Sequence, residues 1–148
     1  MAIPLGQLPA TPRRRLAVLS CMDARVNVEN VLGLAPGDAH VIRNAGGIVT
    51  DDVIRSLAIS QQALGTVSVV VMQHSDCAMT RISDSEFSAT LVADVGHRPP
   101  WSVGAFSDLD ASVRAGVQEL STSPYLSDVE DIRGFVYELN SGVMREVR

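Results

Sequence analysis

Two cysteines and one histidine are the residues in this sequence whose types and spacing are best suited to chemistry. Cys21 opens the segment Cys21-Met-Asp23-Ala-Arg25, and the segment His74-Ser-Asp-Cys77 follows later in the chain. Two thiolates and one imidazole are three ligands, the number that a catalytic zinc ion takes from the protein when its fourth tetrahedral position is left for water. A structural zinc site would use four protein ligands. The pattern therefore predicts the zinc site of a hydrolase or lyase, with Cys21, His74 and Cys77 as ligands.

The overall composition narrows the class of protein. Hydrophobic residues make up 46% and charged residues 20%, which is typical of a soluble globular protein. The net charge is −5, and Arg13-Arg14-Arg15 is the longest basic run, so nucleic acid is not an expected partner. No apolar stretch approaches the roughly 20 residues that cross a bilayer, and the N-terminal residues lack the pattern of a secretory signal. We therefore expect a cytoplasmic protein without a membrane partner.

Two further exclusions concern the chemistry. All 12 basic residues are arginine, which rules out Schiff-base formation on lysine and a lysine general base. The two cysteines could form a disulfide, but in the cytoplasm metal binding explains them better.

Hydrophobic periodicity predicts alternating strands and helices. Apolar and β-branched runs predict strands at 16–20, 39–43 and 66–72. Apolar residues at helical spacing, with capping residues at several ends, predict helices at 27–34, 50–65, 84–94 and 108–120. In the third helix Phe87, Leu91 and Val92 form the expected buried side. Residues 134–139 and 143–147 are typical of a hairpin, or of a strand with a short return.

This order of elements predicts an α/β fold with a mostly parallel sheet flanked by helices and a C-terminal strand or hairpin at the edge. We expect an extended N-terminal arm at 1–12 and a single zinc-binding catalytic domain at 13–148. Ligands of such sheets gather beyond the carboxyl ends of the strands, where the strand order reverses. If the first and third strands are neighbours, about 4.8 Å apart, Cys21, His74 and Cys77 converge without special loops.

The chain resembles the β-class carbonic anhydrases, in particular their small bacterial members. The resemblance is carried by Cys21-Met-Asp23-Ala-Arg25 and His74-x-x-Cys77 in combination. It extends to segments between them, namely His40-Val-Ile-Arg43-Asn44-Ala45-Gly46-Gly47, Ser56-Leu57 and Leu64-Gly65-Thr66. It covers residues 15–80, and residues 134–137 more loosely.

The resemblance implies a zinc enzyme, with one Zn²⁺ per chain, that interconverts carbon dioxide and bicarbonate. It also implies an α/β fold that assembles into a homodimer or homotetramer. Cys21, His74 and Cys77 would be the zinc ligands, and Asp23 and Arg25 would be the paired catalytic residues beside the metal.

The expected chemistry gives Asp23 and Arg25 distinct roles. Zinc lowers the pKa of bound water from about 15.7 to near 7 in the best-known cases. Asp23 would accept a hydrogen bond from the zinc-bound hydroxide and turn its lone pair toward carbon dioxide. The planar guanidinium of Arg25 can hold a carboxylate through two parallel hydrogen bonds, and our hypothesis is that it keeps Asp23 off the metal. The alternative for both residues is a structural ion pair at a strand end.

Three features depart from the family pattern. Ala78 follows the second cysteine where the family usually has glycine, and its methyl group could crowd a tight turn at the metal. Val18 stands where some members have a tryptophan that serves a regulatory bicarbonate, so no such pocket is predicted. The residues before the domain are too few for the long N-terminal helices that embrace a partner subunit in many members.

Two alternative functions and several other residues remain to be placed. The alternatives to a carbonic anhydrase are a hydrolase of a related linear substrate, such as carbon disulfide or carbonyl sulfide, and a non-catalytic zinc-binding or bicarbonate-sensing protein. His40 is expected to be a hydrogen-bonded core or interface histidine. His97 is expected to be solvated in a loop, with proton shuttling as its alternative. Trp101 and both tyrosines are expected in the core or an interface.

Overall fold

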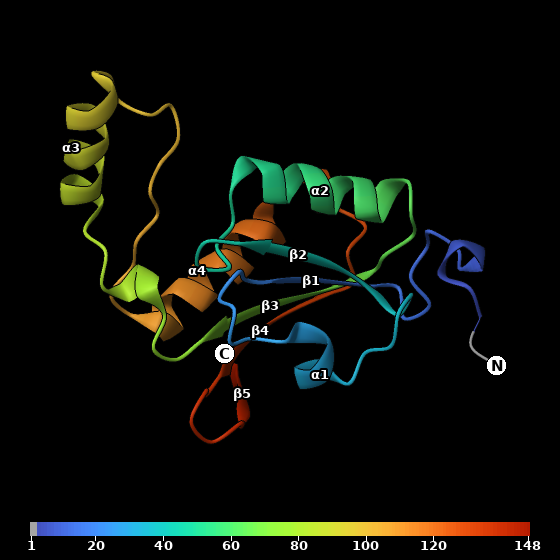
Figure 1. Cartoon of the computed structure of the whole chain (residues 1–148). Helices are drawn as coiled ribbons and strands as arrows, with labels where there is room; N and C mark the ends of the chain where they lie inside the picture. Colours follow the sequence, from blue (N-terminus) through green and yellow to red (C-terminus); the bar gives the residue numbers. More distant parts are fainter. Residues whose placement is uncertain (1–2) are drawn as a thin grey trace.

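The computed structural model describes residues 3–148, in which five strands form one sheet. The strands are β1 (Leu16–Cys21), β2 (Ala39–Asn44), β3 (Ser68–His74), β4 (Asp131–Tyr137) and β5 (Met144–Val147). Their order across the sheet is β2-β1-β3-β4-β5. The first four strands are parallel and β5 is antiparallel to β4, as Figure 1 shows. The predicted fold class, including the C-terminal strand pair at the edge, is confirmed.

Within the described residues, four α-helices and three short 3₁₀ helices precede or connect the strands. They are α1 (Val28–Leu32), α2 (Asp51–Gln62), α3 (Asp84–Val95), α4 (Leu109–Thr122), η1 (Leu5–Gln7), η2 (Ala78–Thr80) and η3 (Pro124–Leu126). Each α-helix follows a capping residue whose side chain accepts a hydrogen bond from a backbone N–H of the first turn; these residues are Asn27, Thr50, Ser83 and Asp108. These caps satisfy N–H groups that have no partner within the helix. None of the helices within residues 3–148 has the length and apolarity to span a membrane.

Both faces of the sheet are covered, which explains why β1 is apolar along its length. On one face Leu19 and Val71 pack with Leu57 of α2 and Leu120 of α4. On the other face Val18 and Met72 pack with Val26 and Val28 at α1. Figure 1 shows α2 and α1 on opposite sides of the sheet. The sheet is therefore a buried platform, and side chains at its strand ends are held in place from both sides.

The helix α3 differs from its prediction. The range 84–94 is close to the observed Asp84–Val95, but the helix has no buried residue, and Phe87 is 40% exposed. Figure 1 shows that α3 projects away from the sheet, so the chain itself does not cover its apolar side. The prediction that Phe87, Leu91 and Val92 are buried is wrong within one chain, because an apolar stripe indicates that a face is to be covered but not by what.

The aromatic residues divide in a similar way. Tyr137 packs against the core, as expected. Trp101 is 57% exposed and Tyr125 is 67% exposed, so neither belongs to the core of the chain.

Gly134 of β4 provides a test of how closely α4 packs on the sheet. A Cβ atom at this position would lie 2.4 Å from Cγ1 of Val113 and 3.0 Å from Cγ2 of Val117. Overpacking of this kind costs about 1–3 kcal/mol, so Gly134→Ala should lower the free energy of unfolding by that amount in urea titration. Gly6→Ala is the control, because no atom of residues 3–148 lies within 4 Å of its added Cβ. An equal effect of the two substitutions would contradict this account.

Candidate metal centre

The three predicted metal ligands lie at the ends of two neighbouring strands. β1 pairs with β2 on one side and with β3 on the other, so the strand order reverses between β1 and β3. Cys21 is the last residue of β1 and His74 is the last residue of β3. Cys77 follows three residues later, before η2. The ligands therefore converge where open α/β sheets bind their ligands, as the sequence predicts.

The geometry of the three side chains suits a metal ion. The two sulfur atoms and the imidazole nitrogen all lie within 4.8 Å of one another, and all three residues are buried. Nδ1 of His74 donates a hydrogen bond to the carbonyl of Ser75 at 2.8 Å, which leaves the lone pair on Nε2. Among the described residues Nε2 has no hydrogen-bond partner although it is buried. An orphaned nitrogen of this kind is best explained by an absent partner, and the outer hydrogen bond on Nδ1 is typical of metal-bound histidine.

The two thiols have different proton affinities. Burial raises the pKa of the Cys21 thiol, but the neighbouring His74 side chain and nearby backbone groups outweigh it and lower the pKa to about 7. Burial, together with the neighbouring Cys21 charge, raises the pKa of the Cys77 thiol to about 11. Cys77 therefore keeps its proton at neutral pH in the metal-free chain.

Metal binding should accordingly release protons. Both cysteines must be thiolates to bind a metal, so zinc addition to the metal-free chain at pH 8 should release protons, chiefly the proton of Cys77. Because protons compete with the metal, affinity should weaken as the pH falls. Calorimetry in buffers of different ionisation enthalpy measures this release. A heat of binding that is independent of the buffer would contradict it.

Backbone contacts hold the loops that carry the ligands. Arg43 of β2 donates from Nε to the carbonyl of Cys21 at 2.9 Å and from Nη2 to the carbonyl of Asp23 at 2.8 Å. The side-chain amide of Asn44 closes the following loop by two hydrogen bonds with the backbone of Ile48. Gly47 has a φ of +62°, and a Cβ there would lie 2.8 Å from the backbone nitrogen of Cys21. Gly47 is thus required by the close approach of two backbones.

Asp23 and Arg25 form the predicted pair beside the ligands. Nε of Arg25 donates to Oδ1 of Asp23 at 3.0 Å, and Nη2 donates to Oδ2 at 2.8 Å. Oδ2 of Asp23 also lies 3.6 Å from Nε2 of His74. The hydrogen bonds from Arg25 hold the pKa of the Asp23 carboxyl well below its usual range. The carboxylate is therefore ionised, clamped by arginine and close to the position that a metal would occupy.

Two residues that sequence reasoning missed complete this arrangement. Asp76 accepts a hydrogen bond from Nη1 of Arg25 at 2.9 Å and another, through its carbonyl, from Nη2 at 2.9 Å. Arg81 donates to the other carboxylate oxygen of Asp76. The available signal was the position of Asp76 between the two ligands of the His74-x-x-Cys77 segment, but its partner cannot be identified from spacing.

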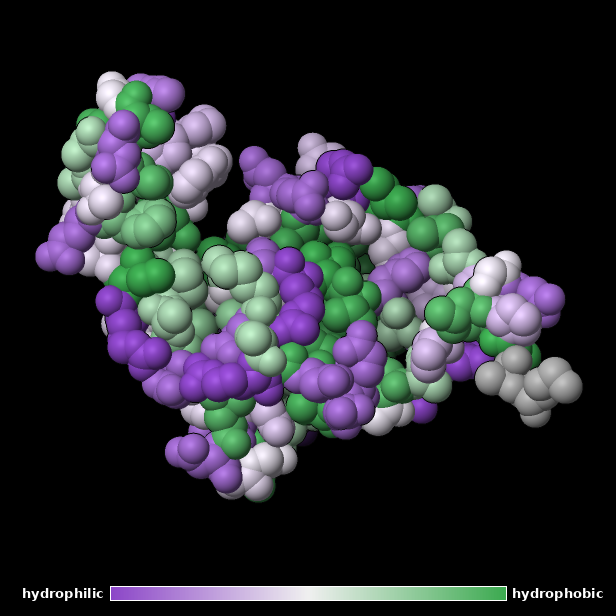
Figure 2. Space-filling view, viewed as in Figure 1, coloured by the Kyte–Doolittle hydropathy of each residue, from purple (hydrophilic) through white to green (hydrophobic). Residues whose placement is uncertain are grey.

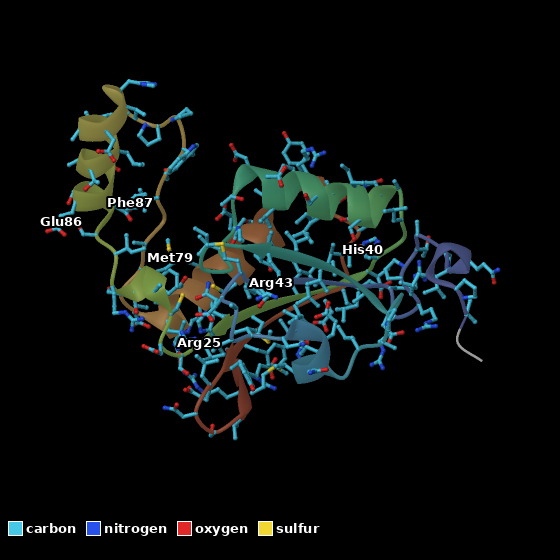
Figure 3. All side chains as sticks on the ribbon, in the orientation of Figure 1. Arg25, His40, Arg43, Met79, Glu86 and Phe87 are labelled. Carbon is cyan, nitrogen blue, oxygen red and sulfur yellow. The ribbon has the colours of Figure 1, made fainter. Side chains whose placement is uncertain are left out.

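His40 and His97 lie outside the metal centre, and Ala78 does not crowd it. His40 is hydrogen-bonded to Ser60 at 2.7 Å and to the carbonyl of Ala10 at 2.9 Å, as expected for a satisfied histidine. Figure 3 shows it toward the opposite end of the sheet from Arg25 and Met79. His97 is exposed beyond the end of α3 that lies away from the sheet, which does not favour a proton shuttle. Ala78 begins η2 with its side chain exposed, so its methyl group does not crowd the centre.

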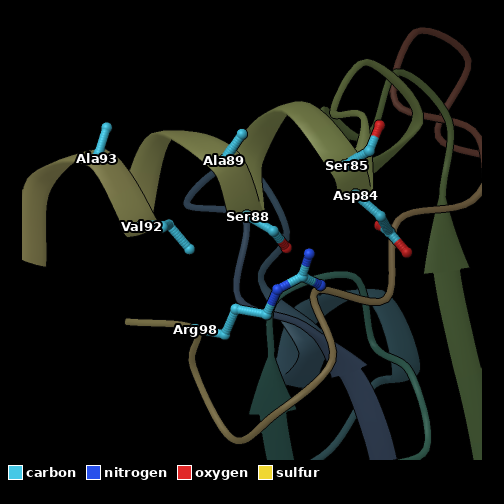
Figure 4. Close-up of a pocket in the computed structure, with 7 residues that line it drawn as sticks. All are labelled: Asp84, Ser85, Ser88, Ala89, Val92, Ala93 and Arg98. Carbon is cyan, nitrogen blue, oxygen red and sulfur yellow. The ribbon is translucent and has the colours of Figure 1, made fainter. Parts of the chain in front are cut away.

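Apolar side chains surround one side of the centre. Cys21, Cys77 and Met79 form a buried cluster against which Ala45 and Phe106 pack. A separate surface hollow lies between α3 and the segment that follows it (Figure 4). Its lining residues are Asp84, Ser85, Ser88, Ala89, Val92, Ala93 and Arg98. None of the predicted site residues lines this hollow, so the metal centre is a distinct, buried feature.

Two thiols and an imidazole converge at the point where the strand order of an open α/β sheet reverses, and an ionised Asp–Arg pair lies beside them. This combination is typical of a metal-dependent enzyme. Comparison with known proteins narrows this class. The family model for carbonic anhydrase matches residues 16–98. Beta-carbonic anhydrase 1 of Mycobacterium tuberculosis is 42% identical over 142 residues, which cover 96% of this chain and 87% of that protein. The chain belongs to the carbonic anhydrase family and, within it, to the β class.

Two further proteins are similar to this chain over most of its length. The crystal structure of a carbonic anhydrase from Streptococcus mutans superimposes with a TM-score of 0.88 at 42% identity, and the match covers 100% of this chain and 87% of that one. A carbon disulfide hydrolase from an Acidianus strain is 34% identical over 158 residues, covering 90% of this chain and 77% of that protein. Both similarities extend over nearly the whole chain, which is therefore related to enzymes of two substrate classes.

Proposed function

We propose that this chain catalyses the reversible hydration of carbon dioxide to bicarbonate with one zinc ion held by Cys21, His74 and Cys77. The observation that carries the proposal is the convergence of three buried donors beside an ionised carboxylate clamped by Arg25. One of the donors, Nε2 of His74, has no hydrogen-bond partner in the part of the chain that the structure describes. A bound zinc ion supplies the Lewis acidity that makes a water molecule nucleophilic near neutral pH.

Asp23 orients the nucleophile in this proposal. Its carboxylate lies 3.6 Å from Nε2 of His74, within reach of a water molecule in the fourth ligand position. With zinc bound, Oδ2 would accept a hydrogen bond from that water and would turn its lone pair toward the carbon of the substrate. Without Arg25 the same carboxylate could itself occupy the fourth position. The two hydrogen bonds from Arg25 oppose this movement and reserve the position for water.

The surroundings favour a small uncharged substrate. Met79 and its apolar neighbours line one side of the centre, and carbon dioxide is apolar, so it can approach without a polar partner. Carbon disulfide and carbonyl sulfide are also linear and apolar. Over comparable lengths of chain, the identity to the carbonic anhydrase is 42% and the identity to the carbon disulfide hydrolase is 34%. This difference favours carbon dioxide as the substrate.

Stopped-flow hydration on protein of measured zinc content tests this function. We expect carbon dioxide hydration above the buffer rate at alkaline pH and a slower release of hydrogen sulfide from carbon disulfide. Stoichiometric zinc without carbon dioxide hydration would overturn the proposal. Faster turnover of carbon disulfide would assign the chain to the alternative substrate.

We also infer assembly into a homodimer or homotetramer and a cytoplasmic location. The apolar side of α3 is uncovered within the chain, with Phe87 40% and Val95 64% exposed, and Figure 2 shows apolar surface on this projecting helix. Two free thiols that serve as ligands persist best in a reducing compartment.

The assembly has a direct test. Phe87→Asp should shift the mass measured by light scattering toward that of a monomer, because a charge would have to be buried in the interface. Val143→Asp is the control, since Val143 is also exposed (56%) but lies outside α3, before β5. A monomeric parent protein would contradict the inference.

A further inference from the structure

Asp76 has a backbone conformation that is unusual for its residue type. Its φ is +54°, and within residues 3–148 Arg15 is the only other residue besides glycine with a positive φ. This left-handed region is sterically unfavourable for residues with a side chain, although Asp and Asn tolerate it better than most. Asp76 lies between the ligands His74 and Cys77, so its conformation is imposed at the metal centre itself.

The conformation turns two acceptors of one residue toward a single guanidinium. The carbonyl oxygen of Asp76 accepts from Nη2 of Arg25 at 2.9 Å, and Oδ2 accepts from Nη1 at 2.9 Å. Nε and Nη2 of the same guanidinium donate to Asp23. All three nitrogens of Arg25 are thus engaged, with a carboxylate on each side. Arg81 in turn holds the remaining oxygen of Asp76.

These contacts are exposed, which indicates what they can contribute. The side chains of Arg25 and Asp76 are 50% and 56% exposed, and exposed ion pairs add little to stability. They can still restrict the orientation of the arginine, because a guanidinium bound on two edges cannot rotate freely. Orientation matters here, since a misplacement of about 1 Å in a reacting group can cost roughly 100-fold in rate.

We propose that Asp76 is a positioning residue for the hydration reaction: it fixes the guanidinium of Arg25 in the plane in which Arg25 clamps Asp23. Asp76 touches neither substrate nor metal and acts only through Arg25. Arg81 supports it by holding its second carboxylate oxygen. The proposal rests on the proposed function, because Asp23 is the group whose orientation is finally controlled.

Two substitutions separate the side chain from the backbone of Asp76. Asp76→Gly removes the carboxylate, keeps the carbonyl and accepts the positive φ, whereas Asp76→Asn keeps an oxygen acceptor and tolerates this φ as well. We expect Asp76→Gly to lower kcat/KM about tenfold at unchanged zinc content and Asp76→Asn to lower it less, since loosening an orientation costs part of the roughly 100-fold effect of misplacement. Asp110→Asn is the matched control: Asp110 also binds an arginine, Arg145, by two hydrogen bonds, and its loss should leave kcat/KM unchanged.

A double-mutant cycle tests whether Asp76 acts through Arg25. In an Arg25→Ala background, Asp76→Gly should cause no further loss of kcat/KM, because the group that it positions is already absent. The same fold loss in both backgrounds would overturn the proposal. Full activity of Asp76→Gly alone would overturn it too.

A crystal structure of metal-free Asp76→Gly supplies a readout that does not depend on activity. The Arg25 guanidinium should leave the plane of the Asp23 carboxylate or occupy several rotamers, whereas it should remain ordered in the Asp110→Asn control. An unchanged Arg25 would overturn the proposal. If the parent protein bound zinc but did not hydrate carbon dioxide, the proposed function would fail, and the orientation of Arg25 in this structure would still decide the role of Asp76.

Discussion

Replacing His74 with glutamine is expected to abolish both zinc retention and carbon dioxide hydration. His74 is buried, its Nδ1 is bound to the Ser75 carbonyl and its Nε2 is aimed at the two thiols, so a substitution removes one of three ligands. Loss of an outer hydrogen-bond partner already costs roughly 10–100-fold in metal affinity, and loss of a direct ligand should cost more. Zinc content after dialysis and stopped-flow hydration measure the two effects.

His40→Gln is the matched control for this substitution. His40 is also hydrogen-bonded through both ring nitrogens, to Ser60 and Ala10, but it lies outside the metal centre. Its substitution should leave zinc content and hydration rate at the parental level. Cys77→Ser should reproduce the effect of His74→Gln, because a neutral hydroxyl replaces a thiolate ligand. If His74→Gln retained one zinc per chain and the parental rate, the assigned ligand set would be wrong.

Replacing Asp23 with asparagine should lower the hydration rate by about 100-fold, the usual cost of misplacing a reacting group, because Asp23 orients the nucleophile in the proposed function. The zinc content should not change, because Asp23 is not among the ligands. The amide retains the shape of the carboxylate but has one oxygen acceptor, no charge and a donor group that would face the guanidinium of Arg25. Hydration rates normalised to zinc content measure this loss.

Arg25→Ala extends the same test. Without the clamp, Asp23 is free to move toward the fourth ligand position, so hydration should fall while zinc is retained. Arg133→Ala is the matched control, because Arg133 also binds a carboxylate, Glu146, through two hydrogen bonds but does so on the β4–β5 pair. Undiminished hydration by Arg25→Ala at full zinc content would show that the Asp23–Arg25 pair is structural.

The central part of the fold could be predicted from the sequence, because the apolar and β-branched runs that indicate its strands are local. The apolar run that became β1 and the β-branched run that became β3 place Cys21 and His74 at strand ends. Strand boundaries were less accurate: β3 begins two residues later than expected and extends to His74, because pairing with β4 as far as Tyr137 continues the ladder. The environment of α3 was not predictable, since its apolar stripe is the same whether a sheet or another subunit covers it.

By itself the sequence determined which residues are the candidate ligands, their placement at or near strand ends, and the presence of an acid and an arginine beside the first of them. Those properties follow from residue type, spacing and periodicity, which are local properties of the sequence. The tertiary structure alone decided that β1 and β3 are neighbours, that Nε2 of His74 has no partner among the described residues, and that Arg25 is shared between Asp23 and Asp76. These three features depend on long-range pairing and on the left-handed backbone conformation of Asp76. Neither can be predicted from local periodicity.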